Sequence, residues 1–250
     1  MNKPSRPPST AKRSVHGQIA DELGWRIVTG GFAPGSVLPT EGDYSARLSV
    51  SRTSFREAIK MLAGKGLVES RPKTGTRVRQ RTEWNMLDPD VTAWAFRTGP
   101  DPGYARAFFE FRRIIEPAAA SLAATRRDEA DLNRMHDSLE GMAAATSLQE
   151  WIEPDLSFHL AILAATRNEL LVSLGHLLVP ALTRSFTIVN IDADKRRISV
   201  PLHRAVYAAV ERGNADAAEA AMKRLLDGAL DDLVEMIGAD GAARSKKRGK

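Results

Sequence analysis

The sequence predicts a mainly α-helical protein in two parts: an N-terminal part of helices and one β-hairpin, and a C-terminal bundle of helices alone. Three observations lead to this fold class. Apolar residues recur at helical spacing over most of the 250 residues. Two short strand-like runs flank a Pro-Lys-Thr-Gly turn. The hydrophobic content of 43% includes few aromatic residues and many Ala and Leu residues, a balance typical of largely helical proteins.

The first part is expected to open with a helix over residues 14–30. Apolar residues recur there every three to four positions, and a pair of glycines ends the pattern. Thr40 then stands where it can cap a short helix that ends near Leu48, and Ser51 where it can cap a second helix through Gly64. Hydroxyl groups at such positions accept a backbone N–H that the helix itself leaves unpaired.

Two short strands, 66–69 and 76–79, follow and are joined by a turn over 72–75. Two helices that meet at a turn and precede a basic hairpin form a winged helix-turn-helix, whose second helix enters the major groove of DNA. We therefore expect residues 14–80 to bind DNA. Side chains at the start of the second helix and at the hairpin tip suit phosphate oxygens and base edges. The candidate DNA-binding residues are Ser51, Arg52, Thr53, Arg56, Lys73, Thr74 and Gly75.

Residues 81–100 are expected to form an irregular linker, because turn-forming residues interrupt every periodic pattern there. From 101 to 238 the pattern is helical and predicts an all-α bundle of about six helices. The breaks fall near residues 127, 146, 167, 190 and 213. The ends of the chain, 1–13 and 239–250, are polar and basic, and both are expected to be disordered.

Charge is distributed unevenly along the chain. Residues 1–83 hold 15 Lys and Arg against 7 Asp and Glu, a net charge of +8. Residues 84–240 hold 16 against 24, a net charge of −8, and the last ten residues add +5. This asymmetry concentrates attraction for phosphate in the part that carries the helix-turn-helix motif.

Composition also excludes several classes of protein. The chain has no Cys, which rules out disulfides and thiolate metal sites and fits an intracellular location. No apolar run approaches the roughly 18 residues that cross a bilayer, and the N-terminus lacks the apolar core of a signal peptide. We therefore expect a cytoplasmic protein with no membrane partner.

The N-terminal motif is specific enough to resemble a known family. The matching segments are Leu38-Pro39-Thr40-Glu41, Val50-Ser51-Arg52-Thr53, Arg56-Glu57-Ala58, Gly66-Leu67-Val68 and Gly75-Thr76. Over about residues 14–80 the chain resembles the DNA-binding domain of the GntR family of bacterial transcriptional regulators. One departure is Gly42, where the family commonly has an Arg that touches the DNA backbone.

Two pairs of residues in the second part could carry chemistry. Asp155 and His159 are four positions apart, so they share one helical face and could ligate one ion or form an ordinary hydrogen bond. Arg112 and Glu116 have the same spacing and could form an intrahelical ion pair. The spacing alone does not choose between these readings.

The second part is similar to the FCD effector domain of the FadR subfamily. The matching segments are Arg112-Arg113-Ile114-Ile115-Glu116-Pro117, Asp155 to His159, Asn168 and His203 to Val210. This resemblance implies that Asp155, His159 and His203 join a third His in binding a divalent cation. The third position is Leu225 here, so a zinc or nickel ion would be weakly bound. A pocket that binds an anion directly is the alternative.

The resemblance also places Arg112 in the effector cavity, where its guanidinium would clamp a ligand carboxylate. Arg184 is a second cationic candidate. The linker segment 84–94 is similar to that of the branch that controls the catabolism of galactonate and related sugar acids. The effector-binding residues that we expect are Arg112, Asp155, His159, Arg184 and His203.

These observations predict a homodimeric regulator, expected to be a repressor, that leaves a double-stranded DNA operator when it binds a small carboxylate, foremost a sugar acid. Another organic acid, an amino acid or a fatty acyl ligand stays open as the effector. An enzyme is disfavoured, because no nucleophile or general base accompanies the candidate metal ligands. A purely architectural DNA-binding protein would leave the helical bundle without a purpose.

Overall fold

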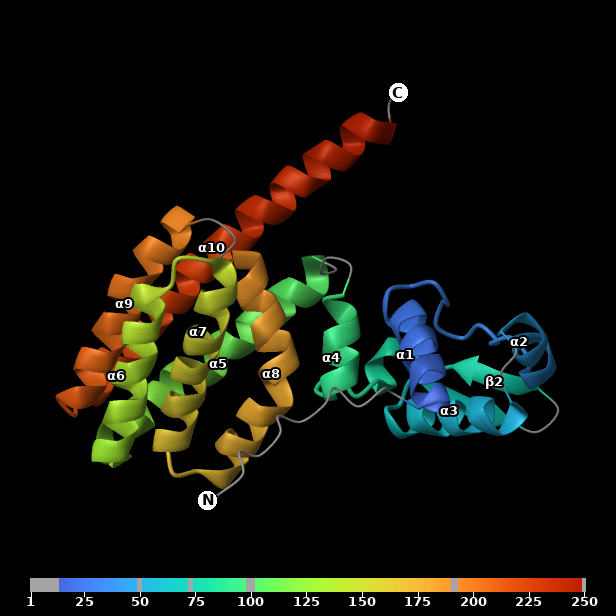
Figure 1. Ribbon diagram of the computed structural model, residues 1–250, viewed down its shortest axis with the longest axis horizontal. Coiled ribbons are helices and arrows are strands. Elements are labelled where there is room, and N and C mark those ends of the chain that lie inside the picture. The colour runs from blue at the N-terminus through green and yellow to red at the C-terminus, as the bar shows by residue number, and fades with distance from the viewer. Residues whose placement is uncertain (1–13, 49–50, 72–73, 98–101, 190–192, 249–250) are drawn as a thin grey trace, which may run out of the picture. The chain divides into compact units, whose positions relative to one another are not determined.

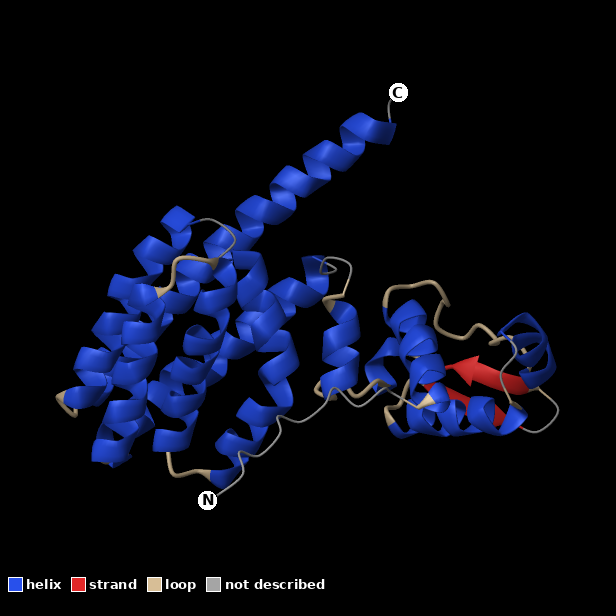
Figure 2. Ribbon diagram, in the orientation of Figure 1, coloured by secondary structure: helices blue, strands red, loops and turns tan. Residues whose placement is uncertain are grey.

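The computed structural model describes residues 14–48, 51–71, 74–97, 102–189 and 193–248. The chain divides into two compact units, Met1–Trp94 and Ala95–Lys250. Helices dominate both units, and the two strands belong to the first unit (Figure 2). The mainly α-helical fold class is therefore confirmed.

The first unit contains the predicted winged helix-turn-helix. Its elements are α1 (Val15–Val28), α2 (Glu41–Leu48), α3 (Arg52–Gly64), β1 (Val68–Arg71) and β2 (Gly75–Val78). The strands pair antiparallel with Val68 opposite Val78 and Arg71 opposite Gly75. Leu23 of α1 and Leu62 of α3 are fully buried in its core. The predicted helices and hairpin are thus confirmed to within a few residues.

Local signals in the sequence account for the helix starts. The Ser51 hydroxyl accepts the backbone N–H of Ser54 at 3.1 Å and so caps α3. Thr40 and Asp43 exchange bonds at the start of α2: the Thr40 N–H donates to the Asp43 carboxylate at 3.2 Å, and the Asp43 N–H donates to the Thr40 hydroxyl at 3.3 Å. Both caps were expected from the sequence.

The expected irregular linker over 81–100 differs from the structure. Arg81–Glu83 form a 3-10 turn, Pro89–Ala95 form helix α4, and the first unit continues to Trp94. The Trp94 indole N–H donates to Asp21 of α1 at 2.8 Å, and its ring lies so close to Gly24 that a Cβ there would sit 2.3 Å from it. Burial of Trp84, Val91 and Trp94 outweighs the local turn signals. Residues 98–100 lie outside the described residues.

Lys65 ties this extension to the helix-turn-helix motif. It is the C-cap residue of α3, and its ammonium group lies 2.8 Å from Asp88 and 2.9 Å from Asp90. Asp88 also accepts the backbone N–H of Asp90 at 3.0 Å, at the start of α4. The segment that joins the motif to the second unit is therefore held as part of the first unit.

The second unit is an all-α bundle (Figure 1). Over the described residues it contains α5 (Pro102–Arg126), α6 (Glu129–Ala144), α7 (Leu148–Ala165), α8 (Glu169–Val189), α9 (Ala193–Glu211) and α10 (Ala215–Arg248). The gaps between these helices coincide with the predicted breaks near residues 127, 146, 167 and 213, and the predicted break near residue 190 lies outside the described residues. Small and apolar side chains of α5, α6, α7, α9 and α10 form the main core. No described helix is long and apolar enough to span a membrane.

The C-terminal boundary differs from the expectation of a disordered tail over 239–250. Helix α10 continues to Arg248, and its last turns run beyond the other helices of the unit (Figure 1). Ala, Arg and Lys have high helix propensity, and basic residues near a helix C-terminus interact favourably with its dipole. The expected arm over residues 1–13 lies outside the described residues.

Candidate DNA-binding face and ligand cavity

The start of α3 presents the predicted basic face. The side chains of Arg52 and Arg56 are 78% and 70% exposed, and Thr53 between them is also exposed. The Ser51 hydroxyl caps α3 by accepting the Ser54 N–H, so it already has a structural role apart from any contact with DNA. Two guanidinium groups at the first turns of an exposed helix have the reach and geometry to read guanine edges.

The hairpin supplies the second predicted contact region. Thr74 and Gly75 are exposed at its tip, and Gly75 adopts a φ of +83°, which favours glycine. Lys73 lies outside the described residues. The tip therefore offers backbone groups and a hydroxyl for phosphate contacts.

The sequence analysis missed Glu41 on this face. Its carboxylate accepts the Arg56 Nε–H at 2.8 Å, and its other oxygen lies 4.0 Å from Arg52 Nε. Glu41 lies in the first turn of α2, where the helix dipole stabilises its negative charge. The sequence signal that could have identified Glu41 is that it is an acidic residue within a basic motif. Its neighbour Gly42 is exposed, and an added Cβ would approach only the Thr40 hydroxyl, at 3.8 Å.

A cavity of about 290 Å³ lies in the second unit between α5, α7, α9 and α10. Arg112, Asp155, His159 and His203, which the sequence proposed as effector or metal residues, all line it. All four are nearly completely buried. The structure therefore brings together residues that are up to 91 positions apart (from 112 to 203) in the sequence.

Asp155, His159 and His203 form the predicted triad. One ligand atom from each lies within 4.8 Å of those of the other two. Asp155 Oδ1 is 3.4 Å from His159 Nε2 and 3.1 Å from His203 Nε2. Asp155 Oδ2 accepts the Trp151 indole N–H at 3.0 Å, which orients the carboxylate.

The outer nitrogen of each imidazole meets an acceptor. His159 Nδ1 donates to Glu116 Oε2 at 2.6 Å, and His203 Nδ1 donates to the Ser199 carbonyl at 2.9 Å. These contacts place a proton on Nδ1 of each imidazole and direct Nε2 toward Asp155. Each Nε2 then either carries a proton that it donates to the carboxylate or presents a lone pair to a cation. The donor set therefore fits a divalent cation such as zinc or nickel.

The buried carboxylates remain charged. Burial alone would raise the pKa of Asp155, but hydrogen bonds from His159 and His203 hold it below its ordinary value. Burial opposes ionisation of Glu116 too, yet the charges of Arg112 and His159 lower its pKa to about 2. Burial would lower the pKa of His159, whereas the Glu116 charge raises it above its ordinary value.

Arg112 fits both expectations, the ion pair that its spacing from Glu116 allows and the place in the cavity that the family resemblance implies. Its Nε–H donates to Glu116 at 2.6 Å, which is the intrahelical ion pair, and its side chain also lines the cavity. Arg112 Nη2 lies 3.5 Å from His159 Nε2. Glu116 thus joins the cationic residue and the triad through one carboxylate.

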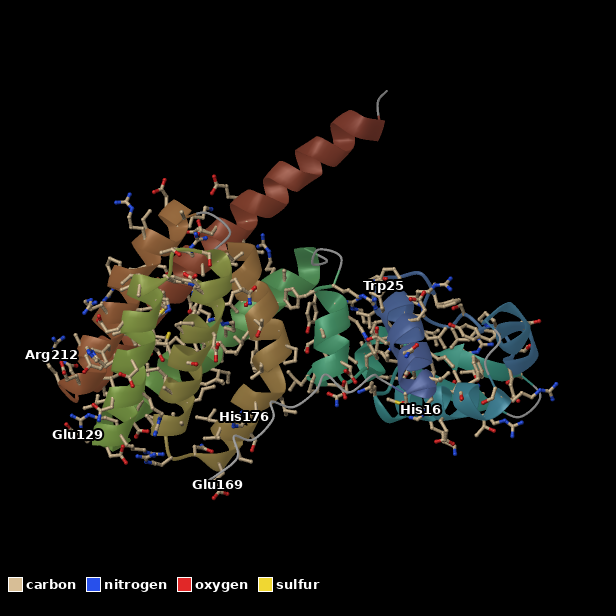
Figure 3. All side chains as sticks on the ribbon, in the orientation of Figure 1. His16, Trp25, Glu129, Glu169, His176 and Arg212 are labelled. Carbon is tan, nitrogen blue, oxygen red and sulfur yellow. The ribbon has the colours of Figure 1, made fainter. Side chains whose placement is uncertain are left out.

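The remaining candidates fall in different places. Leu225 lines the cavity and is 4% exposed, so an apolar side chain occupies the position of the third His. Arg184 lies in α8, and its side chain is outside the described part of the structure. His176, which no sequence motif singles out, is exposed on α8 (Figure 3) and does not line this cavity. Three charged residues that line the cavity, Lys195, Asp231 and Asp232, belong to no sequence motif and were not predicted.

Comparison with known proteins identifies the family. Residues 16–78 match the family described as "Bacterial regulatory proteins, gntR family", and residues 107–228 match the FCD domain. The chain is 32% identical over 219 residues to the uncharacterized HTH-type transcriptional regulator YieP of Escherichia coli K12, covering 86% of this chain and 94% of that protein. The chain belongs to the GntR family. It is a transcriptional regulator with an FCD domain.

This GntR regulator is similar to further transcriptional regulators and to a solved structure. It is 32% identical over 222 residues to the galactonate operon transcriptional repressor of E. coli K12, covering 88% of this chain and 96% of that repressor. It is 33% identical over 214 residues to the HTH-type transcriptional regulator LutR of Bacillus subtilis 168, covering 83% and 95%. The solved structure of Listeria monocytogenes Lar shares the fold with a TM-score of 0.65 and 16% identity, over 90% of this chain and 99% of that one.

Proposed function

We propose that this GntR regulator is a homodimeric cytoplasmic repressor that leaves its operator when a small carboxylate, foremost a sugar acid, enters the FCD cavity. The cavity lined by Arg112, Asp155, His159 and His203 is the single observation that carries this proposal. A purely architectural DNA-binding domain would have no use for a buried cluster of charged and imidazole groups. The similarity to the galactonate operon transcriptional repressor supports a sugar acid.

On DNA, Arg52 and Arg56 read base edges, while Ser51, Thr53 and the hairpin residues Lys73, Thr74 and Gly75 contact the backbone. One winged helix-turn-helix domain makes few DNA contacts, and a two-fold symmetric dimer doubles the number of these contacts on a palindromic operator. Glu41 keeps the Arg56 guanidinium in place between binding events, because its carboxylate accepts the Arg56 Nε–H.

In the cavity, Arg112 takes the effector carboxylate, and Arg184 is a second cationic candidate. Asp155, His159 and His203 hold a divalent cation, zinc or nickel, which supplies positive charge and open coordination positions when bound. Metal ligation requires neutral imidazoles, and in that state Asp155 and Glu116 outweigh Arg112, so the cation supplies the positive charge that a carboxylate effector needs there. Leu225 leaves the position of the third His to water or to effector oxygens, which makes the ion weakly held.

Effector binding acts by a shift between two dimer geometries. An effector that binds one geometry more tightly than the other shifts the dimer toward that geometry, and it lowers the affinity for DNA by the same factor by which DNA lowers the affinity for the effector. Coupling of this kind commonly changes affinity by about 5–150-fold.

The proposal is tested by DNA release. The full chain is first used to select a duplex from a random pool, and binding of the labelled duplex is then followed by fluorescence anisotropy. Sugar acids, other organic acids, amino acids and fatty acids are added with and without zinc. We expect a sugar acid to weaken DNA binding at least about fivefold. DNA binding that no acid changes would contradict the effector assignment.

A cavity-filling variant locates the effector. An added Cβ at Gly228 would approach only Leu202 Cδ1, at 3.9 Å, so Gly228→Leu fills space in the cavity without a backbone clash. We expect this variant to bind DNA normally and to lose the response, whereas Gly228→Ala retains it. An unchanged response of Gly228→Leu would place the effector outside this cavity.

A further inference from the structure

The two ends of the cavity differ in exposure and in the side chains that line them. At the deep end, Arg112, His159 and His203 are almost completely buried. At the other end, the side chains of Lys195 and Asp232 are 28% and 34% exposed. Asp231 is exposed and lines the same end. We call Lys195, Asp231 and Asp232 the cavity mouth.

The cation of the mouth is already matched by carboxylates. Lys195 Nζ lies 2.8 Å from Asp232 Oδ1 and 3.0 Å from Glu235 Oε2, so it links the start of α9 to α10. Asp231 adds another negative charge beside this pair. Two carboxylates contact the ammonium group, and with Asp231, which adjoins Asp232 in the sequence, the four side chains carry a formal charge of −2.

This charge pattern favours one chemical class of ligand. Carboxylates are pure acceptors, so they receive hydrogen bonds from hydroxyl groups and repel a second carboxylate. Between the two ends, the walls are formed by Ile198, Leu202, Leu226 and Ala229, which suit the carbon atoms of a short chain. A volume of about 290 Å³ falls at the lower end of known ligand pockets, so the cavity suits a small acid and not a long acyl chain.

We propose that the cavity mouth makes Asp231 and Asp232 specificity-determining residues, which select monocarboxylates that carry hydroxyl groups at the far end and reject acids with a second carboxylate there. This inference rests on the proposed function, because it assumes that the deep end binds the first carboxylate. It goes further by separating aldonic acids from the aldaric acids that differ from them only in the terminal carbon.

Three kinds of six-carbon acid separate the effect of the hydroxyl groups from the effect of a second carboxylate. An aldonate has one carboxylate and a terminal hydroxyl, the matching aldarate has a carboxylate at both ends, and hexanoate has one carboxylate and no hydroxyl. Binding of each stereoisomeric aldonate–aldarate pair and of hexanoate to the full chain is measured by calorimetry with one equivalent of zinc. We expect the best aldonate to bind at least about tenfold more tightly than either other acid, because specificity comes from repulsion as well as from new contacts.

Variants of the mouth then test the assignment. Asp231→Asn combined with Asp232→Asn removes two negative charges, and we expect the preference for aldonate over aldarate to shrink at least about threefold, because the repulsive element is lost. The matched control is Asp227→Asn, because Asp227 is a partly exposed α10 carboxylate that pairs with Arg113 and does not line the cavity. It should leave the preference unchanged.

The outcomes separate the two proposals. Wild-type protein that binds the aldarate or hexanoate as tightly as the aldonate would overturn the selectivity of the mouth, while the carboxylate effector would stand. A preference that the double variant and the control alter equally would also overturn it. Failure of all three acids to bind would contradict the sugar-acid effector itself.

Discussion

His159 Nδ1 lies 2.6 Å from Glu116 Oε2, so a carboxylate on α5 orients an imidazole on α7. The same carboxylate accepts from Arg112 at 2.6 Å. Glu116 therefore fixes the tautomer of one proposed metal ligand and the position of the proposed carboxylate-binding cation. This shared contact makes the cavity a single connected unit, and substitutions in it have specific consequences.

Glu116→Gln tests the connection. The amide keeps the shape of Glu116 but loses the charge that orients His159, and removal of such an outer partner commonly costs about 10–100-fold in metal affinity. We expect a loss of this size in a zinc titration by calorimetry. The control is Glu140→Gln, which removes an exposed carboxylate that pairs with Arg204 on the surface of the same unit. Zinc affinity equal to that of the wild type would show that Glu116 does not orient a metal ligand.

Leu225→His tests the missing ligand. An imidazole at this cavity-lining position adds a third nitrogen donor, so we expect zinc and nickel uptake to rise at least about tenfold. Metal content after dialysis against a mild chelator, determined by elemental analysis, reports the change. Leu225→Ala removes the same apolar side chain without adding a donor and should not gain metal. A wild-type protein that keeps a stoichiometric ion through chelation would refute the weakly held site.

Arg52→Ala and Arg56→Ala test the DNA-binding face. A bidentate Arg–guanine contact contributes about 1–3 kcal/mol of discrimination, so each variant should lose about 5–150-fold in affinity for the selected duplex. Arg212→Ala removes an exposed Arg of the second unit (Figure 3) and serves as the control for charge. Mobility-shift titrations measure the effect. Tight binding by both α3 variants would mean that other residues read the operator.

Gly42→Arg tests the departure from the family pattern. The position is exposed and open, and Arg has a higher helix propensity than Gly, so the substitution should fold. An added phosphate contact raises affinity and steepens the dependence of log K on log salt by about 0.9. Gly42→Gln supplies a side chain of similar reach without charge. An unchanged salt dependence for Gly42→Arg would place this position away from the DNA backbone.

Lys65→Met tests the attachment of α4 and its dependence on pH. Burial would lower the pKa of Lys65, but bonds to Asp88 and Asp90 raise it above 10.5. A raised pKa means that this stabilisation is fully present below pH 10.5 and is lost as the pH rises through the folded-state value. We expect Lys65→Met to lose about 1–3 kcal/mol in urea unfolding at pH 8 and to approach the wild type at higher pH.

The control for this pH series is Lys60→Met on the same helix. The side chain of Lys60 is 73% exposed and pairs with Glu57 at the surface, where an ion pair contributes little. A loss in Lys65→Met that persists unchanged at alkaline pH would show that the packing of the side chain, and not its charge, holds α4.

Local chemistry determined most of the fold. The caps at Thr40 and Ser51 and the helix breaks near residues 127, 146, 167 and 213 depend on neighbouring residues, which is why sequence patterns were enough to predict them. The spacing of Asp155 and His159 is likewise a property of one helix. By contrast, the Trp94 ring packs against Gly24, and this contact makes the turn-rich segment part of the first unit. Burial of side chains distant in sequence outweighs the local preference for turns.

Tertiary structure alone decided the surroundings of the proposed site. His159 and Glu116 are 43 positions apart in the sequence. Lys195 of α9 forms an ion pair with Asp232 of α10, and no sequence motif links these two residues. Such contacts depend on how helices pack, which the sequence pattern of one helix does not encode. The residues that we propose to bind a carboxylate and a metal were therefore readable from the sequence, whereas the acidic mouth of the cavity required the structure.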